Sequence, residues 1–154
     1  MLWDIDVRLE DAFIAYLKSK ITGEVKVYAG LTDEKIQYPC AVVMSTGSEP
    51  VSEQAEWHDP RKYEIEIAIL TEACAETTGS MRTSRERHAA AFSDVMNVLA
   101  VSDLLEQIVG MQIDKLALSM AQVASGKITR AHEAEHRKMV SVIPIDVIAE
   151  PTTT

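Results

Sequence analysis

The sequence predicts an α+β fold, with an antiparallel or mixed β-sheet of about five strands and two main helices packed on one face. The first observation is the alternation of apolar and charged residues over 61–70, which is typical of a strand with one buried and one wet face. The second is a helical spacing of apolar residues over 5–21 and 81–99. The inward residues of the central strand are β-branched or aromatic: Tyr63, Ile65, Ile67 and Ile69.

The first helix is predicted near the start of the chain, where apolar residues recur every three or four positions. These residues are Ile5, Leu9, Phe13, Tyr16, Leu17 and Ile21. Asp4 or Asp6 suits the N-terminal end, because an acidic side chain there can cap the helix. Gly23 is expected to end it.

The second main helix is predicted to cover the sheet. Thr83 and Glu86 have the spacing of a capping box. The apolar residues that follow, from Met81 to Leu99, share one face. Between Ser102 and Gly110 the sequence predicts one further short helical turn.

Four more strands are predicted, at 24–28, 40–44, 113–120 and 137–148. The second of these should stop at residues 46–50, which leaves 46–60 as the longest irregular stretch. Pro144 has no N–H for a β-ladder, so the last strand is expected at the edge of the sheet or bulged at this residue.

The composition indicates a single soluble domain over residues 1–150, with 151–154 as a frayed tail. The chain of 154 residues is 47% hydrophobic and carries a net charge of −9. Nucleic acids are bound through a basic face, so this charge argues against phosphate binding. No apolar run approaches the roughly 18 residues of a membrane span, so no membrane association is expected.

The two cysteines are expected to remain reduced. The opening residues lack the charged-then-apolar layout of a signal peptide, which favours a reducing compartment. Cys40 adjoins an apolar strand and is interpreted as a small core residue. The sequence leaves open whether Cys40 and Cys74 ever pair.

Residues 46–60 are the candidate interaction segment, because a long loop is often used by a partner. It carries four acidic residues and one tryptophan, Glu49, Glu53, Glu56, Asp59 and Trp57. The alternative is a long hairpin loop whose tryptophan folds back on the sheet.

One motif suggests catalysis. Residues 132–136 match H-E-x-x-H, in which a helix presents two imidazoles to zinc and the glutamate acts as general base. Here the flanking residues are charged rather than apolar, and 138–148 is predicted as a strand, so no packed helix is expected. We therefore interpret 132–136 as a charged, solvated segment that leads into the last strand, rather than as a zinc site at His132 and His136.

Other catalytic templates fit less well. Residues 125–128 resemble the end of a phosphate-binding loop, but Ala121 replaces its first glycine and Ile128 its hydroxyl residue. There is no G-x-S-x-G elbow. His58 and His88 are interpreted as a loop residue and a helix residue. No catalytic residue, cofactor or metal is predicted.

The order of elements resembles the tail terminator, tail completion and tail-to-head joining proteins of long-tailed bacteriophages. The resemblance covers residues 5–149 and is carried by layout rather than by an invariant motif. Its parts are an amphipathic opening helix, a loop that closes on Tyr38-Pro39-Cys40-Ala41-Val42-Val43, an acidic loop, the strand at 61–67, a helix with His88, Phe92 and Val95, and the terminal strand at 139–143.

The resemblance implies a non-enzymatic structural protein of a phage or prophage. Members of this family form a ring, commonly of six subunits, that caps the tail tube and joins it to the head. The implied partners are copies of the same chain, the tail tube protein and a head-completion or connector protein, while DNA passes through without specific binding. The implied location is the tail–head junction of the virion, after assembly in the host cytoplasm.

Two alternatives remain. One is another phage neck or tail-tube assembly protein of similar fold. The other is a small zinc hydrolase, because the segment 132–136 matches no feature of the terminator family.

Overall fold

The computed structural model describes residues 4–30, 32, 34–52, 59–72, 80–133 and 138–152. In chain order its elements are α1 (Ile5–Lys20), β1 (Lys26–Ala29), β2 (Cys40–Pro50), β3 (Arg61–Glu72), α2 (Ser80–Leu99), α3 (Leu104–Val109), β4 (Leu116–Val123), the 3₁₀ helix η1 (Ser125–Lys127), β5 (Thr129–Glu133) and β6 (Lys138–Pro151).

The sheet has six strands in the order β1-β2-β3-β6-β4, and β5 also pairs with β6. β1 runs parallel to β2 and the other pairs are antiparallel. The predicted α+β class and mixed sheet are therefore confirmed. The additional strand is β5, whose residues Thr129–Glu133 include no large apolar side chain and so give no strand pattern.

β3 is the central strand that its alternation predicts. Its odd-numbered residues from Tyr63 to Thr71 are buried, whereas the even-numbered ones are half-buried or exposed. Ile65 lies opposite Ile145 and Ile67 opposite Ile143 on the neighbouring β6. The paired isoleucines form a continuous apolar layer on one face of the sheet.

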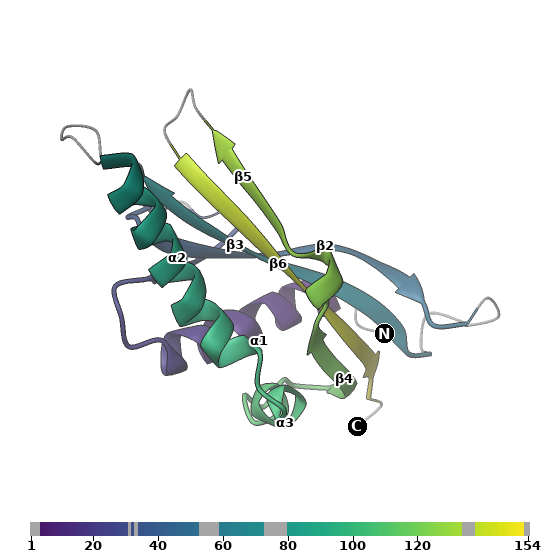
Figure 1. The fold of residues 1–154 in the computed structure, drawn as a ribbon. Coiled ribbons are helices and arrows are strands. Elements are labelled where there is room, and N and C mark those ends of the chain that lie inside the picture. Colours follow the sequence, from purple (N-terminus) through teal and green to yellow (C-terminus); the bar gives the residue numbers. More distant parts are fainter. Residues whose placement is uncertain are drawn as a thin grey trace.

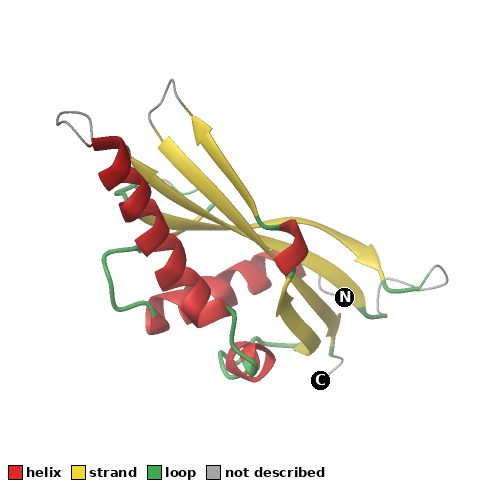
Figure 2. Cartoon of the chain, in the orientation of Figure 1, coloured by secondary structure: helices red, strands yellow, loops and turns green. Residues whose placement is uncertain are grey.

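All three α-helices lie on the side of the sheet that this layer faces (Figures 1 and 2). α1 crosses over β1 and β2, and α2 lies over β3. One hydrophobic cluster joins the helices to the inner sheet face. Its largest fully buried side chains include Leu9, Phe13, Leu17, Leu99, Leu104 and Ile108.

β2 is longer than predicted. The strand does not stop at residue 46 but continues to Pro50, through a register shift between Ser45 and Gly47. A β-bulge of this kind lets a strand continue past an interruption in its side-chain alternation. The connection between β2 and β3 is therefore shorter than 46–60 and spans residues 51–60.

β6 is an internal strand, and its register with β3 has no shift at Pro144, so the prediction of an edge strand or of a bulge at this residue is wrong. It pairs with β3 on one side and with β4 and β5 on the other. Pro144 lies where the second partner changes from β5 to β4. Its carbonyl accepts the Ala124 N–H at 2.9 Å, while the Ala124 carbonyl accepts the Lys127 N–H of η1. Residue 144 thus supplies an acceptor. Its missing N–H interrupts neither ladder on this side, because residue 144 pairs with neither β5 nor β4.

Candidate functional site

The hairpin of β2 and β3 extends beyond the helix-covered part of the sheet (Figure 1). We call its outer end, Gly47–Pro50 paired with Arg61–Glu64, the hairpin arm. The β2 side chains of the arm are exposed. Within the arm, the side chain of Glu49 is 69% exposed, with its Oε1 3.9 Å from Lys62 Nζ.

Of the residues predicted to contact a subunit or a channel, the structure describes Glu49 and Asp59. Glu49 lies in β2, inside the arm rather than in a loop. Asp59 is half-buried just before β3. Glu53, Glu56 and Trp57 lie outside the described residues. The structure therefore brings one predicted acidic residue onto the arm and does not test the others.

The sheet face opposite the helices carries a group of carboxylates. Glu64 lies directly opposite Asp146, and Glu66 follows on the same face of β3. Lys62 is the nearby cation, with its Nζ 3.6 Å from Asp146 Oδ2. The second carboxylate oxygen, Asp146 Oδ1, is buried and has no hydrogen-bond partner among the described residues.

Electrostatics on this face favour additional positive charge. Burial raises the pKa of Glu66, and the charge and hydrogen bond of Glu64 raise it further. A raised carboxyl pKa means that the ionised form is destabilised by its surroundings. Half-buried apolar residues, among them Val42, Leu70, Val142 and Ile148, flank the carboxylates. Such a mixed surface suits contact with a basic protein surface.

A buried chain of three polar side chains connects α2 to the sheet. Thr71 Oγ1 lies 2.8 Å from His88 Nδ1, and His88 Nε2 lies 2.7 Å from Ser141 Oγ. Thr71 and Ser141 are each 3% exposed, and His88 is 1% exposed. Burial lowers the pKa of His88, with a smaller effect from the Arg130 charge.

This chain suits structural anchoring better than catalysis. A Ser-His-Asp triad needs a carboxylate to orient the imidazole and a hydroxyl open to substrate. Here both imidazole nitrogens are occupied by hydroxyl groups, and both hydroxyls are buried. His88 is placed on a helix as predicted, but its two partners lie 17 and 53 residues away and give no local sequence signal.

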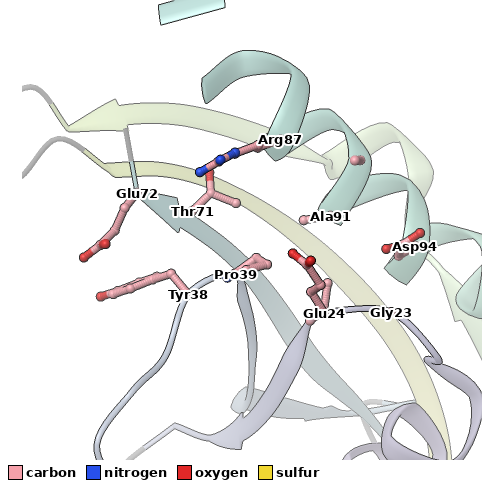
Figure 3. A pocket seen from close by; sticks show the side chains of 11 residues that line it. Gly23, Glu24, Tyr38, Pro39, Thr71, Glu72, Arg87, Ala91 and Asp94 are labelled. Atoms are coloured by element: carbon pink, nitrogen blue, oxygen red, sulfur yellow. The ribbon is translucent and has the colours of Figure 1, made fainter. Parts of the chain in front are cut away.

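A pocket of about 590 Å³ opens between the start of β1, the Tyr38–Pro39 turn, the end of β3 and α2 (Figure 3). Glu24, Glu72, Asp94 and Arg87 line it. The Tyr38 ring already has the Lys138 ammonium group 5.0 Å from its centroid. The lining has the character of a site for cationic groups, and it contains no paired nucleophile and base. Its residues come from separate segments, so the sequence does not reveal it.

The H-E-x-x-H segment is not a helix where the structure describes it. His132 and Glu133 belong to β5, which pairs with Met139 and Lys138 of β6. Successive residues of a strand point to opposite faces, so the helical presentation of ligands is lost here. His136 lies outside the described residues. Among those described, no group of three or more His, Cys, Asp or Glu side chains is arranged to hold a metal.

The segment that resembles a phosphate-binding loop and the cysteines are the other candidates for chemistry. Ser125–Lys127 forms η1. Cys40 is a buried free thiol whose pKa is raised to about 11, mainly by burial, so it is not an activated nucleophile. Cys74 lies outside the described residues. Within the described part of the chain, no helix has the length and apolar character needed to cross a membrane.

Comparison with known proteins finds remote similarity to solved structures. No family model matches the chain, and no curated protein matches it. Among solved structures, a chain in the virion of a native gene transfer agent particle aligns with 91% of this chain and 86% of its own length. The identity is 13% and the TM-score 0.49. A likeness this remote assigns no function to the chain.

Proposed function

We propose that the protein is a structural subunit of a phage or phage-like particle, and that it forms the ring that terminates the tail tube and joins it to the head. The observation that carries this proposal is the hairpin arm, which extends past the helix-covered core with its β2 side chains exposed (Figure 1). Tyr63 on the β3 side of the arm belongs to the hydrophobic core, but the exposed β2 side contributes little to it. This exposed side is well placed to contact a neighbouring subunit.

The sheet provides a second support. Its outer face keeps half-buried apolar residues next to the carboxylates of Glu64, Glu66 and Asp146. Mixed apolar and charged surfaces of this kind are common where proteins meet proteins. A ring subunit needs at least two such surfaces, because each copy contacts a neighbour on both sides.

The charge of the chain fits passage of DNA. Each copy carries a net charge of −9, so a ring accumulates negative charge. A channel wall with this balance repels the duplex phosphates and does not hold them. Glu49 is an exposed acidic residue on the arm and is a candidate for the channel wall.

Assembly is the direct test. Native mass spectrometry over a range of concentrations should show a shift from monomer to a closed ring, expected to be a hexamer. Electron microscopy with purified tail tubes should then show the protein at one end of each tube. A protein that stays monomeric at high concentration and never decorates tube ends contradicts the proposal.

The same experiments separate the terminator from another neck or tail-tube protein. A terminator caps a finished tube at one end. A tail-tube subunit instead polymerises into stacked rings or adds along the tube, and a neck protein binds the head connector without binding tubes.

A further inference from the structure

Exposed lysines gather at one edge of the sheet, around β1. Lys18 and Lys26 line one open depression of about 340 Å³ whose floor is partly apolar. Lys20 lies in the last turn of α1. Lys35 is exposed in the connection that follows β1. Among the described residues of this edge, the counter-charges are Glu24, Glu34 and Asp94, which lies beside Gly23, so the four lysines outnumber them.

The opposite edge, formed by β4 with α3 beside it, is acidic. Its exposed carboxylates are Asp4, Asp6, Asp103, Glu106, Asp114 and Glu150. Arg8 and Lys115 are the cations there, and Arg8 is already paired with Asp4 at 3.1 Å and with Asp114 at 3.8 Å. The described residues of this edge therefore keep an excess of negative charge.

α1 links the two edges and shares their polarity. It begins on the α3 side, where the Arg8 guanidinium donates to the Asp114 carbonyl, and it ends on the β1 side (Figure 1). Its first turn contains Asp6 and its last turn contains Lys18 and Lys20. The charge of the domain is thus separated across the width of the sheet, in spite of an overall charge of −9.

β1 is also the outer strand at one edge of the sheet, and β4 shares the other edge with β5. The Lys26 N–H donates to Pro39 on the β2 side. Because alternate residues of a strand face opposite neighbours, Val27 and Ala29 direct their main-chain groups away from the sheet. An outer strand with free main-chain groups can pair with a strand of another chain.

We infer that a second copy of this chain occupies these edges, with the lysine-rich β1 edge of one copy docked against the acidic β4 edge of the next. The inference rests on the proposed function, since a ring closes only through such head-to-tail contacts. β1 runs parallel to β2 and β4 antiparallel to β6. A sheet continued from one copy to the next would therefore join β4 and β1 in antiparallel direction.

Complementary charge is needed for this contact. Two copies that each carry −9 repel one another overall, and opposite charges at the contact offset the repulsion and fix the orientation of docking. Raised salt should weaken the contact, because exposed charges are screened.

The test is a charge exchange between the two edges. Variant one, Lys26→Glu with Lys35→Glu, makes both edges acidic. Variant two, Glu106→Lys with Asp114→Lys and Glu150→Lys, makes both edges basic. All five side chains are exposed, so the monomer fold, followed by circular dichroism, should be retained. Each variant alone should weaken assembly by about tenfold or more, because like charges then face each other.

An equimolar mixture of the two variants should assemble again. In alternating order, every contact in the mixed ring joins an acidic edge to a basic one. Sedimentation velocity and native mass spectrometry at matched concentration and salt give the readout. The matched control is Arg85→Glu at an exposed position of α2, compared with Lys26→Glu, because the two substitutions change the net charge by the same amount.

Three outcomes overturn the edge contact while leaving the ring intact. They are variants that assemble as the wild type does, a mixture that fails to recover although both variants are folded, and a control that weakens assembly as much as Lys26→Glu. Wild-type protein that never assembles overturns both this contact and the proposed function.

Discussion

His88 joins α2 to two adjacent strands, through Thr71 of β3 and Ser141 of β6. A neutral imidazole has one donor and one acceptor nitrogen, and each hydroxyl can take the complementary role. All three groups are therefore satisfied without water. Buried polar groups are tolerated when they are paired in this way, and each becomes costly when its partner is removed.

Replacing His88 with leucine should destabilise the protein by about 1–3 kcal/mol, because the buried hydroxyls of Thr71 and Ser141 lose their partner. Urea unfolding measures the change. The control is the triple variant Thr71→Val, His88→Leu, Ser141→Ala, which removes all three polar groups and should recover much of the loss. If the triple variant is instead clearly less stable than His88→Leu, the hydroxyls of Thr71 and Ser141 have other hydrogen-bond partners, and the assigned role of His88 is wrong.

His88 should also make stability depend on pH. Burial lowers the pKa of His88 in the folded protein, while in the unfolded chain the imidazole takes up a proton near its ordinary value of about 6.5. As pH falls below about 6.5, the unfolded state binds more protons than the folded state. The contribution of neutral His88 to the free energy of unfolding is therefore complete above that pH and decreases as pH falls towards the pKa of His88 in the folded protein.

The measurement is the free energy of unfolding from pH 7.5 to 5 for the wild type and for His88→Leu. Carboxylates such as Glu66, whose raised pKa acts in the opposite direction, are present in both proteins and cancel in the difference. The advantage of the wild type should shrink as pH falls. A difference that stays flat across this range contradicts the assignment to His88.

At the scale of elements, β3 provides the sharpest contrast between faces. Ile67 is fully buried against Ile143, and Ile67→Asp should prevent folding, since an unpaired carboxylate in an apolar layer costs several kcal/mol against a total of about 5–15. Glu66→Lys on the other face should change stability by about 0.5 kcal/mol or less, because it removes a carboxylate already opposed by Glu64. Circular dichroism melts compare them, and equal damage would mean that both faces are buried.

Pro144 gives a second prediction for an element. Pro144→Ala should cost about 1 kcal/mol or more, because it adds a buried N–H at a residue that pairs with neither β4 nor β5. Loss of the proline also increases the conformational entropy of the unfolded chain, which lowers the free energy of unfolding by about 0.4–1 kcal/mol. Pro60→Ala, in the residue before β3, loses the proline term without adding an N–H to the ladder. Equal urea midpoints for the two variants would contradict the role assigned to Pro144.

The predictable elements are those in which the spacing of apolar residues in the sequence matches the buried face in the structure. β3 and α1 each have one buried face, so period and burial coincide. β5 pairs with β6 while its side chains from Thr129 to Ala131 are exposed, and its residues show no period. β2 continues through a bulge that breaks the alternation. His88 and the pocket near Tyr38 depend on residues far apart in sequence, which no local pattern brings together.

At the scale of the whole molecule, the three α-helices on one face of the sheet leave the other face, the outer strands and the hairpin arm available for contacts (Figure 1). Each of these features brings charge with it: carboxylates on the open face, lysines at β1 and acidic residues at β4. A single copy gains little stability from them, because exposed charges contribute little to folding. Their arrangement fits the proposed assembly of copies into a ring.

The connection at the tip of the arm can be tested apart from the fold. Replacing residues 51–60 with Asn-Gly joins Pro50 to Arg61, which are already paired, through a two-residue turn suited to a hairpin. The β2–β3 ladder is retained and the loop is shorter, so the thermal midpoint should stay within a few degrees of the wild type.

Ring formation or attachment to tail tubes should be lost, because the replaced segment carries Glu53, Glu56, Trp57 and Asp59. Native mass spectrometry and microscopy with tubes give the readout, and Glu49→Gln, which removes one arm charge without shortening the chain, is the control. A shortened protein that still forms rings and caps tubes would exclude this segment from the interface and leave the sheet edges as the contacts that close the ring.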